Sequence, residues 1–362
     1  MRPGQGKKRP ILAGRGRVGA VAGATSIRIR LRAEKDASMG LSLTEQTVGT
    51  DLEGVLIINK PGGWTSHDVV AKVRKMLGVR KVGHTGTLDP SATGVLVLCL
   101  GKATRIAEYL VLADKAYRAM LRLGVATDTQ DADGAVIMRH QGSFPEEQTI
   151  RSVMQACVGI NHQVPPMYSA VKVKGVPLYK AARAGLTVPR ASRECLIHDL
   201  KIVSIQRSPT VDVVFDVVCS KGTYVRTLCA DIGETLGVGG HLVCLERRRV
   251  GRFTLEQALT LADLTDAVTR GDVQGCLHSL PDALAELPAF RLDPVSSAAA
   301  CHGTGFSPAR ILDTQGSWTS GTPVRLHGPD GRLLAIGKAP WASKDPAWQA
   351  SADIVKIEKV LV

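Results

Sequence analysis

The sequence lacks any apolar run long enough to cross a membrane. The longest candidate, near Val95–Leu100, is far shorter than the roughly 18 residues that a membrane-spanning helix needs. The eight cysteines include no Cys-X-X-Cys pair, and no group of cysteines and histidines has zinc-binding spacing. We therefore expect no membrane segment, no metal, no disulfide framework and a reducing, cytoplasmic location.

Acidic residues are scarce at the amino terminus. Residues 1–36 carry ten basic side chains against two acidic ones, so they account for +8 of the formal charge of +13 and the rest of the chain for +5. The basic balance is thus only a weak indication of nucleic-acid binding by the remainder. We expect residues 1–50 to form a flexible tail, with three alternatives: a basic RNA-binding arm, an organelle-targeting segment of about 38 residues, or an over-long start with Met39 as the true initiator.

From Gly54 onward, hydrophobic and turn patterns predict alternating regular elements. At 362 residues, with 44% hydrophobic and 22% charged residues, the chain has the length and composition of two or three ordinary globular domains. We expect strands at 54–59, 94–100, 117–125, 169–173 and 211–218, and helices at 65–77, 147–158, 178–184, 226–236 and 255–267. Because no regular βαβ repeat is present, we expect an α+β fold with a mixed, largely antiparallel sheet.

The carboxy-terminal part has a different pattern. A hairpin signal covers Pro323–Lys338, with a Gly-Pro-Asp-Gly turn, and an alternating strand covers Asp353–Val360. We therefore expect a small β domain over residues 288–362.

The most distinctive segment is a glycine-rich loop, Gly-His-Thr-Gly-Thr-Leu-Asp-Pro-Ser-Ala-Thr-Gly, at residues 83–94. It is not a phosphate-binding P-loop, because that motif needs Gly-Lys-Ser/Thr followed by a helix. The loop contains one carboxylate, Asp89, whose local turn is fixed by the proline that follows. By spacing alone, Asp89 is as compatible with a simple turn-capping role as with catalysis.

This loop resembles the catalytic motif of the bacterial TruB-type tRNA pseudouridine synthases. Four further motifs of that family follow the expected order: Lys-Pro-Gly-Gly-Trp-Thr-Ser (60–66), Asp-Lys-Ala-Tyr-Arg (114–118), Gln-Val-Pro-Pro-Met-Tyr-Ser-Ala-Val-Lys (163–172) and Cys-Ser-Lys-Gly-Thr-Tyr-Val-Arg-Thr-Leu (219–228). The resemblance covers residues 51–285 and implies the pseudouridine synthase fold. More weakly, residues 288–362 resemble the PUA-like RNA-binding barrel of the same family.

The resemblance implies an isomerase that converts the T-loop uridine of tRNA (position 55) into its C-glycoside without a cofactor. Asp89 would be the nucleophile or glycosidic-bond catalyst, Arg226 the cation that keeps it ionised, and Tyr224 the general base. If residues 224–226 are extended, Tyr224 and Arg226 share one face and both can point at Asp89. If the helix has already begun, they cannot.

The resemblance also implies substrate-binding residues. Tyr117 would stack on the flipped uracil, Leu245 would line its pocket, and His84 would fill the gap that the base leaves. Glu246 stands where the family pattern has an arginine, which puts local RNA contacts in doubt. Basic residues near the motifs are candidates for phosphate contacts: Lys60, Lys81, Lys172, Lys174, Lys221, Arg247, Arg248 and Arg249.

Two alternatives remain open at this point. One is a guide-RNA-dependent relative of archaeal and eukaryotic type, which needs partner proteins. The other is a tRNA-folding chaperone whose active site is unused, although chaperoning and catalysis are compatible. The stand-alone tRNA pseudouridine synthase, by contrast, would have the T-arm stem-loop of tRNA as its partner and no obligate protein partner.

Overall fold

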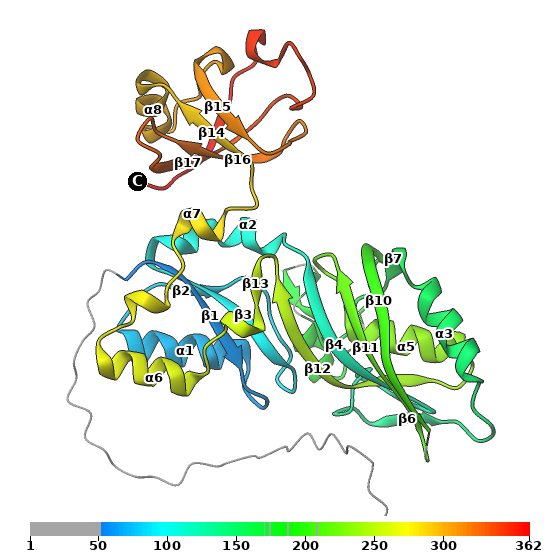
Figure 1. The fold of residues 1–362 in the computed structure, drawn as a ribbon. Helices are drawn as coiled ribbons and strands as arrows, with labels where there is room; N and C mark the ends of the chain where they lie inside the picture. Colours follow the sequence, from blue (N-terminus) through cyan, green and yellow to red (C-terminus); the bar gives the residue numbers. More distant parts are fainter. Residues whose placement is uncertain (1–51, 170, 174, 187, 208) are drawn as a thin grey trace, which may run out of the picture. The chain divides into compact units, whose positions relative to one another are not determined.

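The structure, a computed structural model, describes residues 52–362 except 170, 174, 187 and 208. A nine-stranded sheet occupies residues 54–254 and a five-stranded sheet residues 289–360 (Figure 1). The predicted boundary near residues 285–288 falls between these sheets. The predicted tail, residues 1–50, lies outside the described residues. No helix of the described part is long and apolar enough to span a membrane.

The nine-stranded sheet has the order β1-β3-β12-β4-β11-β10-β7, with β2 beside β3 and β13 beside β12. Its strands are antiparallel except where β12 runs parallel to β3, so the prediction of a mixed, largely antiparallel sheet is confirmed. The strands are β1 (Gly54–Lys60), β2 (Val82–His84), β3 (Thr93–Leu100), β4 (Lys115–Leu123), β7 (Gly159–Gln163), β10 (Arg193–Arg207), β11 (Val211–Cys219), β12 (Gly240–Val250) and β13 (Phe253–Thr254).

Strands β1 and β3 are covered on both faces, which explains their uninterrupted apolar sequences. One face packs against α1 (Ser66–Leu77) and α6 (Leu261–Arg270), which lie side by side in Figure 1. The other packs against α2 (Ala107–Val111) and α7 (Leu280–Ala283). As expected, α1 begins at a threonine cap: Thr65 and Asp68 form a reciprocal capping box.

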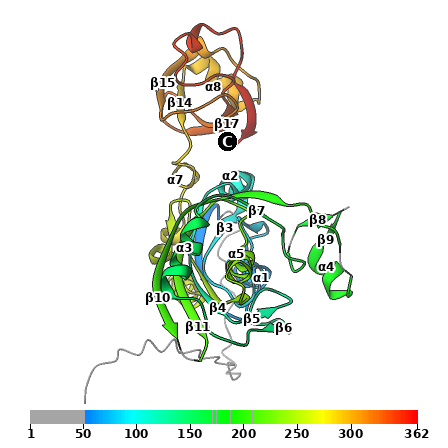
Figure 2. The same ribbon diagram turned by 90° about the vertical axis from the view of Figure 1, so that its right-hand side faces the viewer.

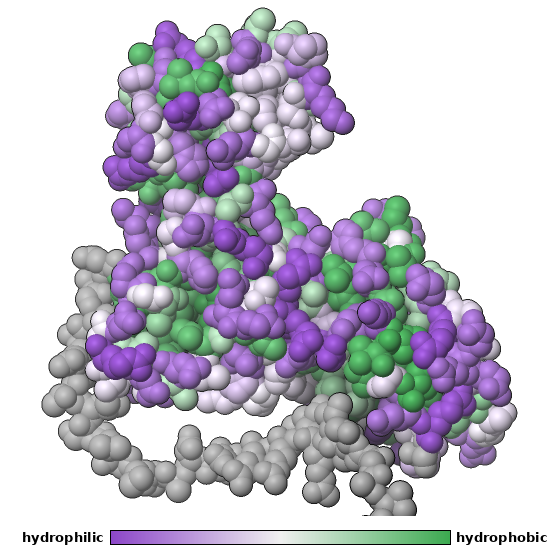
Figure 3. All heavy atoms as spheres, viewed as in Figure 1, coloured by the Kyte–Doolittle hydropathy of each residue, from purple (hydrophilic) through white to green (hydrophobic). Residues whose placement is uncertain are grey.

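The other half of the sheet carries α3 (Glu147–Ala156) and α5 (Val225–Thr235). Residues of both helices share one hydrophobic core with β4, β10 and β11, and Figure 2 shows α5 on the concave side of these curved strands. Hydrophobic residues also gather over β10 and β11 on the face seen in Figure 3. The exposed apolar side chains of β10 include Leu196 and Val203.

Smaller elements complete this part of the chain. They are the 3₁₀ turns η1 (Gly101–Ile106), η2 (Leu255–Gln257) and η3 (Gln274–Cys276), the strand pairs β5 (Val125–Thr127) with β6 (Val136–Arg139) and β8 (Lys172–Val173) with β9 (Val176–Pro177), and α4 (Leu178–Arg183).

Some sequence predictions need correction. The helix expected at 255–267 is two elements, η2 and α6, because Thr254 and Thr260 each start a new capping box, with Gln257 and Asp263. Within the strand expected at 169–173, only Lys172–Val173 is assigned as β8. The long strands β10 and β12 were not predicted at all.

The five-stranded sheet has the order β15-β14-β16-β17-β18, and β14 runs parallel to β16. The predicted hairpin is confirmed as β16 and β17. In the core of this sheet, Phe290 stacks with Trp341 and Trp348 and meets Trp318 edge-on. The elements are β14 (Ala289–Leu292), α8 (Pro294–Cys301), η4 (Pro308–Arg310), β15 (Ile311–Gln315), β16 (Pro323–His327), β17 (Leu333–Lys338), η5 (Trp348–Ala350) and β18 (Lys356–Val360).

Candidate active site

Asp89 lies in the loop between β2 and β3, and the backbone on both sides of it is held in place. On one side, the hydroxyl of Ser66 accepts from the Leu88 amide (2.9 Å) and lies 3.2 Å from the Leu88 carbonyl. On the other, the Pro90 carbonyl accepts from the Gly63 amide (2.9 Å) and from Lys60 Nζ (3.1 Å). The two motifs 60–66 and 83–94 therefore form one structural unit around Asp89.

Lys60 is fully buried, with an exposed fraction of 0%. Its ammonium also donates to the carbonyls of Pro61 (2.9 Å) and Trp64 (2.7 Å). Burial lowers the pKa of this amine to about 8, while the negative charge of Asp89 acts in the opposite direction. A fully buried ammonium does not fit the predicted contact with an RNA phosphate. Lys60 instead supports the Asp89 loop through its hydrogen bond to the Pro90 carbonyl.

Arg247 is buried as well, at 2% exposure, so the three consecutive arginines do not form one solvent-facing patch. Its guanidinium donates to the carbonyls of Val95 (2.7 Å), Gly86 (3.0 Å) and Thr87 (3.4 Å). Gly94 packs so tightly against the Arg247 backbone that a Cβ there would overlap it. Arg247 thus braces the loop, which is a correction to its predicted role on the RNA backbone.

The neighbouring arginines are partly exposed on β12. Arg248 pairs with Glu246 (3.2 Å), the residue that departs from the family pattern. Arg249 donates to the Gly251 carbonyl at 2.7 Å. Both remain candidates for contacts with RNA.

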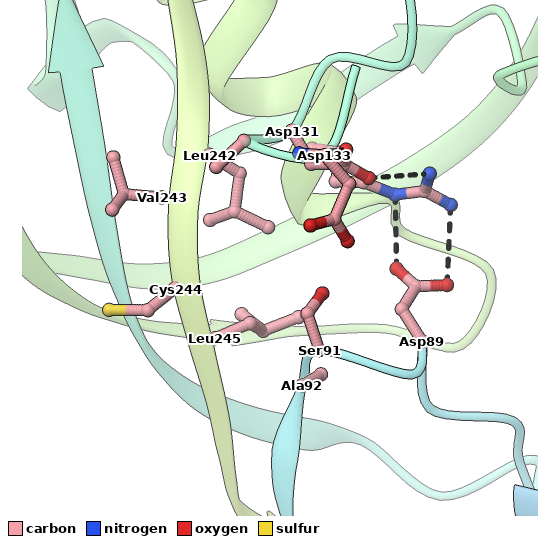
Figure 4. A pocket seen from close by; sticks show the side chains of 11 residues that line it. Asp89, Ser91, Ala92, Asp131, Asp133, Leu242, Val243, Cys244 and Leu245 are labelled. Atoms are coloured by element: carbon pink, nitrogen blue, oxygen red, sulfur yellow. Dashed lines mark hydrogen bonds and ion pairs between the residues drawn. The ribbon is translucent and has the colours of Figure 1, made fainter. Parts of the chain in front are cut away.

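Asp89 forms an ion pair with Arg226, which is nearly buried (Figure 4). The distances are 3.0 Å from Nε to Oδ2 and 3.4 Å from Nη2 to Oδ1. The same guanidinium also contacts Asp131 Oδ2 at 3.2 Å and donates to the Tyr168 carbonyl at 2.9 Å. Arg226 is therefore fixed by three separate segments and presents its edge to Asp89.

The electrostatics of Asp89 result from opposing effects. Burial raises the pKa of its carboxyl, the Arg226 cation lowers it, and the nearby Asp131 charge raises it. Burial is the largest of these effects, so the pKa of Asp89 lies above that of an ordinary aspartate although Arg226 is in contact with it.

Tyr224 is the N-cap of α5. Its backbone is extended (φ −101°, ψ 107°) and the helix begins at Val225, so the second of the two alternatives above holds: Tyr224 and Arg226 do not share one face. Within the described part of the chain, the structure brings Arg226, but not Tyr224, into hydrogen-bond contact with Asp89.

The predicted substrate-binding residues surround the loop. Tyr117 on β4 is half-buried and lies opposite Arg247 across the β4–β12 pair. Leu245 lines the same cavity as Asp89. His84 ends β2, where its Nδ1 accepts from the Gly86 amide (3.3 Å) and its ring meets that of His67 edge-on. Burial lowers the pKa of His84, which favours the neutral ring.

A cavity of about 30 Å³ lies beside Asp89, lined also by Asp131, Arg226, Leu242 and Leu245. A pyrimidine is larger than this space, so we expect the lining side chains to shift when a base binds. Among the described residues, no group of three or more histidine, cysteine or acidic side chains is arranged to hold a metal ion.

Sequence reasoning missed two residues of this site, Asp131 and Gln163. Asp131 lies in the loop 128–134 and its carboxylate accepts from the Thr129 hydroxyl and the Asp133 amide. The side chain of Gln163 forms hydrogen bonds with both the backbone amide and the backbone carbonyl of Tyr224. Asp131 lies in none of the five motifs, and Gln163 lies in one but was not singled out, because a buried amide has no distinct pattern in a sequence.

The comparisons with known proteins agree with one another. The chain matches the profile "TruB family pseudouridylate synthase (N terminal domain)" over residues 74–225 and the profile "tRNA pseudouridylate synthase B C-terminal domain" over residues 226–286. It is 45% identical over 300 residues to a tRNA pseudouridine synthase B of Thermobifida fusca, covering 81% of this chain and 97% of that protein. The corresponding protein of Syntrophotalea carbinolica is 42% identical over 294 residues, covering 81% and 94%.

Among solved structures, a chain of a Cbf5-Nop10-Gar1 complex is similar, with a TM-score of 0.69, 31% identity and 85% of each chain covered. A chain from an H/ACA RNP bound to a substrate RNA containing 2'-deoxyuridine gives a TM-score of 0.67 at 29% identity, with the same coverage.

Proposed function

This chain belongs to the TruB family of pseudouridylate synthases and is an isomerase, and from this premise we propose that it acts on the T-arm stem-loop of tRNA. There it converts the uridine at position 55 into pseudouridine. Support for tRNA as substrate comes from the relatives, which are 42–45% identical and carry the name tRNA pseudouridine synthase B. A role in tRNA modification is also consistent with the expected cytoplasmic location.

In the proposed reaction, Asp89 assists cleavage of the N1–C1′ bond, as nucleophile or as glycosidic-bond catalyst. The uracil then rotates, C5 bonds to C1′, and the C5 proton is lost to a base, while N1 gains a proton in its place. Arg226 keeps Asp89 ionised in a partly dry site. Tyr224 is the proposed base.

The base must leave the RNA stack to reach Asp89, which costs a few kcal/mol unless other groups replace the stacking and pairing that it gives up. We assign His84 to the gap, Tyr117 to stacking on the uracil, and Leu245 to the pocket wall. The small volume of the cavity beside Asp89 supports opening of the pocket on substrate binding. Closure around the base would then exclude water.

The observation that carries this proposal is the ion pair of Asp89 with the buried Arg226. Asp89 itself lies on a loop whose backbone is held by Ser66, Lys60 and Arg247. The test is a T-loop RNA tritiated at uracil C5, because isomerisation must expel that hydrogen. We expect the purified chain to release tritium and Asp89→Asn to release none. Asp199→Asn, at an exposed position on β10, is the control and should release tritium at the parent's rate. Absence of release by the parent, with RNA still bound, would contradict the proposal.

The same assay separates the second candidate, a guide-RNA-dependent synthase. This candidate is favoured by the similarity to a chain of the Cbf5-Nop10-Gar1 complex, at 31% identity, which is lower than the identity to the bacterial relatives. The proposed enzyme needs neither cofactor nor partner protein. It therefore modifies a bare transcript, whereas the guided relative is inactive alone.

We further propose that residues 288–362 form a PUA-like domain that binds RNA. Support comes from the compact five-stranded sheet with its own aromatic core. Binding of tRNA should then slow hydrogen exchange within residues 288–362. Unchanged exchange there would remove this segment from the RNA interface.

A further inference from the structure

Gln163 is the last residue of β7, and its side chain is buried, with 4% exposed. Its carboxamide contacts one residue twice. The Tyr224 amide donates to Oε1 at 2.9 Å, and Nε2 donates to the Tyr224 carbonyl at 3.3 Å. A primary amide is well suited to pair with both backbone groups of a residue in this way, because it carries a donor and an acceptor side by side without a charge.

These two contacts act at the point where α5 begins. The side chain of the N-cap residue, Tyr224, makes no capping hydrogen bond. The Tyr224 carbonyl also accepts the first hydrogen bond of the helix, from the Leu228 amide (3.0 Å). Gln163 therefore helps to fix the residue at which extended backbone becomes helix. A shift of that boundary would move Tyr224 and, two residues later, Arg226.

Gln163 also marks the start of the long connection between β7 and β10. It pairs with Arg193 of β10, so residues 164–192 leave the sheet and return to it at this point. The first part of this connection also contacts the site, because the Tyr168 carbonyl accepts a hydrogen bond from Arg226 Nη2 at 2.9 Å. The short segment from Gln163 to Tyr168 thus contacts both Tyr224 and Arg226.

We propose that Gln163 is a positioning residue for the pseudouridine synthase reaction: it sets the backbone of Tyr224 and the start of α5, and through them the positions of Tyr224 and of Arg226, the partner of Asp89. The inference deepens the proposed function and rests on it. Gln163 need not touch the substrate, since its effect is transmitted by the backbone of the catalytic segment.

Two substitutions test this role. Gln163→Leu removes both hydrogen bonds with little change in volume, and we expect kcat to fall about ten- to hundredfold while KM and RNA affinity stay near the parent's, as for a misplaced catalytic group. Gln155→Leu, at an exposed position on α3, is the control and should leave kcat unchanged. An unchanged kcat in Gln163→Leu, or a loss confined to KM, would overturn the proposal.

Gln163→Glu supplies a readout that a merely structural role would not produce. A protonated carboxyl can accept from the Tyr224 amide and donate to its carbonyl, as the native amide does, whereas the ionised form cannot donate. Burial raises the pKa of such a carboxyl. We therefore expect this variant to be nearly as active as the parent at low pH and to lose activity as pH rises, a limb that the parent lacks. A profile parallel to the parent's would count against the proposal.

Hydrogen exchange distinguishes failure of this inference from failure of the proposed function. The peptide that contains Tyr224 should exchange faster in Gln163→Leu than in the parent, whether or not either releases tritium. If the parent is inactive, the proposed function is wrong, and the exchange rate still decides whether Gln163 positions Tyr224. Equal exchange in the two proteins would overturn the positioning role.

Discussion

At the scale of single residues, the charge on Asp89 is the quantity that the site controls. Burial raises the pKa of Asp89 and Arg226 lowers it. Because the proposed reaction needs the carboxylate, activity should be lost as pH falls through this raised pKa, at a higher pH than for an exposed aspartate. Removal of the cation should raise the pKa further.

We therefore predict that Arg226→Gln moves the acid limb of kcat/KM to higher pH and lowers the maximal rate by about a hundredfold or more. The measurement is the pH profile of tritium release. Arg118→Gln is the control, because Arg118 forms a similar pair with Asp216 but is partly exposed on β4. An unshifted limb in Arg226→Gln would show that this arginine does not set the ionisation of Asp89.

Lys60 offers a second prediction at this scale, concerning stability. Lys60→Met deprives three carbonyls of a donor, and we expect a loss of about 1 to 3 kcal/mol in the free energy of unfolding by urea. The folded pKa is about 8, below the ordinary lysine value of 10.5. The penalty for burying the charge is thus present below pH 8 and relieved as pH rises toward 10.5, so the parent should gain stability relative to the variant over that window.

The exposed Lys102, which pairs with Glu53 at 3.9 Å, supplies the control. Lys102→Met should change the free energy of unfolding by less than about 0.5 kcal/mol. If Lys60→Met is no less stable than the parent, the three hydrogen bonds contribute nothing net and the brace beneath the loop is not needed for folding.

At the scale of elements, strand periodicity explains where prediction from the sequence succeeded and where it failed. Continuous apolar runs located β1 and β3, because both faces of these strands are buried, and the helical period of its one buried face located α1. Arg247, Arg248 and Arg249 were all interpreted as candidates for RNA phosphate contacts, because β12 was not predicted. In a strand, successive side chains point to opposite faces, so Arg247 shares the buried side of Leu245 while Arg248 shares the outer side of Glu246.

The loop of Asp89 could be found from the sequence because it resembles a family motif that lies in one continuous segment. Asp89 and most of the residues that brace it lie in continuous segments, 60–66 and 83–94, whose glycines, prolines and caps have local causes. The contacts of Arg226 are not local, since Asp131 and Tyr168 reach it from distant loops. Burial of Lys60 could not be expected either, because lysines are almost never fully buried; its place at the end of an apolar strand was the only signal.

At the scale of the whole molecule, the distribution of charge decides how RNA is bound. The formal charge of +13 is concentrated in residues 1–36, and the remainder carries only +5. Moreover, Lys60 and Arg247 are buried and bonded to carbonyls. Attraction of a tRNA to residues 52–362 must therefore come from local groups of exposed cations rather than from a general positive surface.

Arg248 and Arg249 follow the buried Arg247 on β12, and both are partly exposed. We predict that replacing both by glutamine weakens tRNA binding and makes the fall of log K with log salt shallower by about 1 to 2, because each arginine that neutralises a phosphate adds about one to that slope. The measurement is a titration of tRNA at several salt concentrations. Arg118→Gln together with Arg122→Gln is the matched control. Both arginines are on the same sheet, but each is held by two hydrogen bonds to one aspartate, Asp216 or Asp212, whereas Arg248 makes a single contact with Glu246. A slope equal to the parent's in the Arg248 and Arg249 variant would mean that β12 serves the reaction only through Leu245 and Arg247.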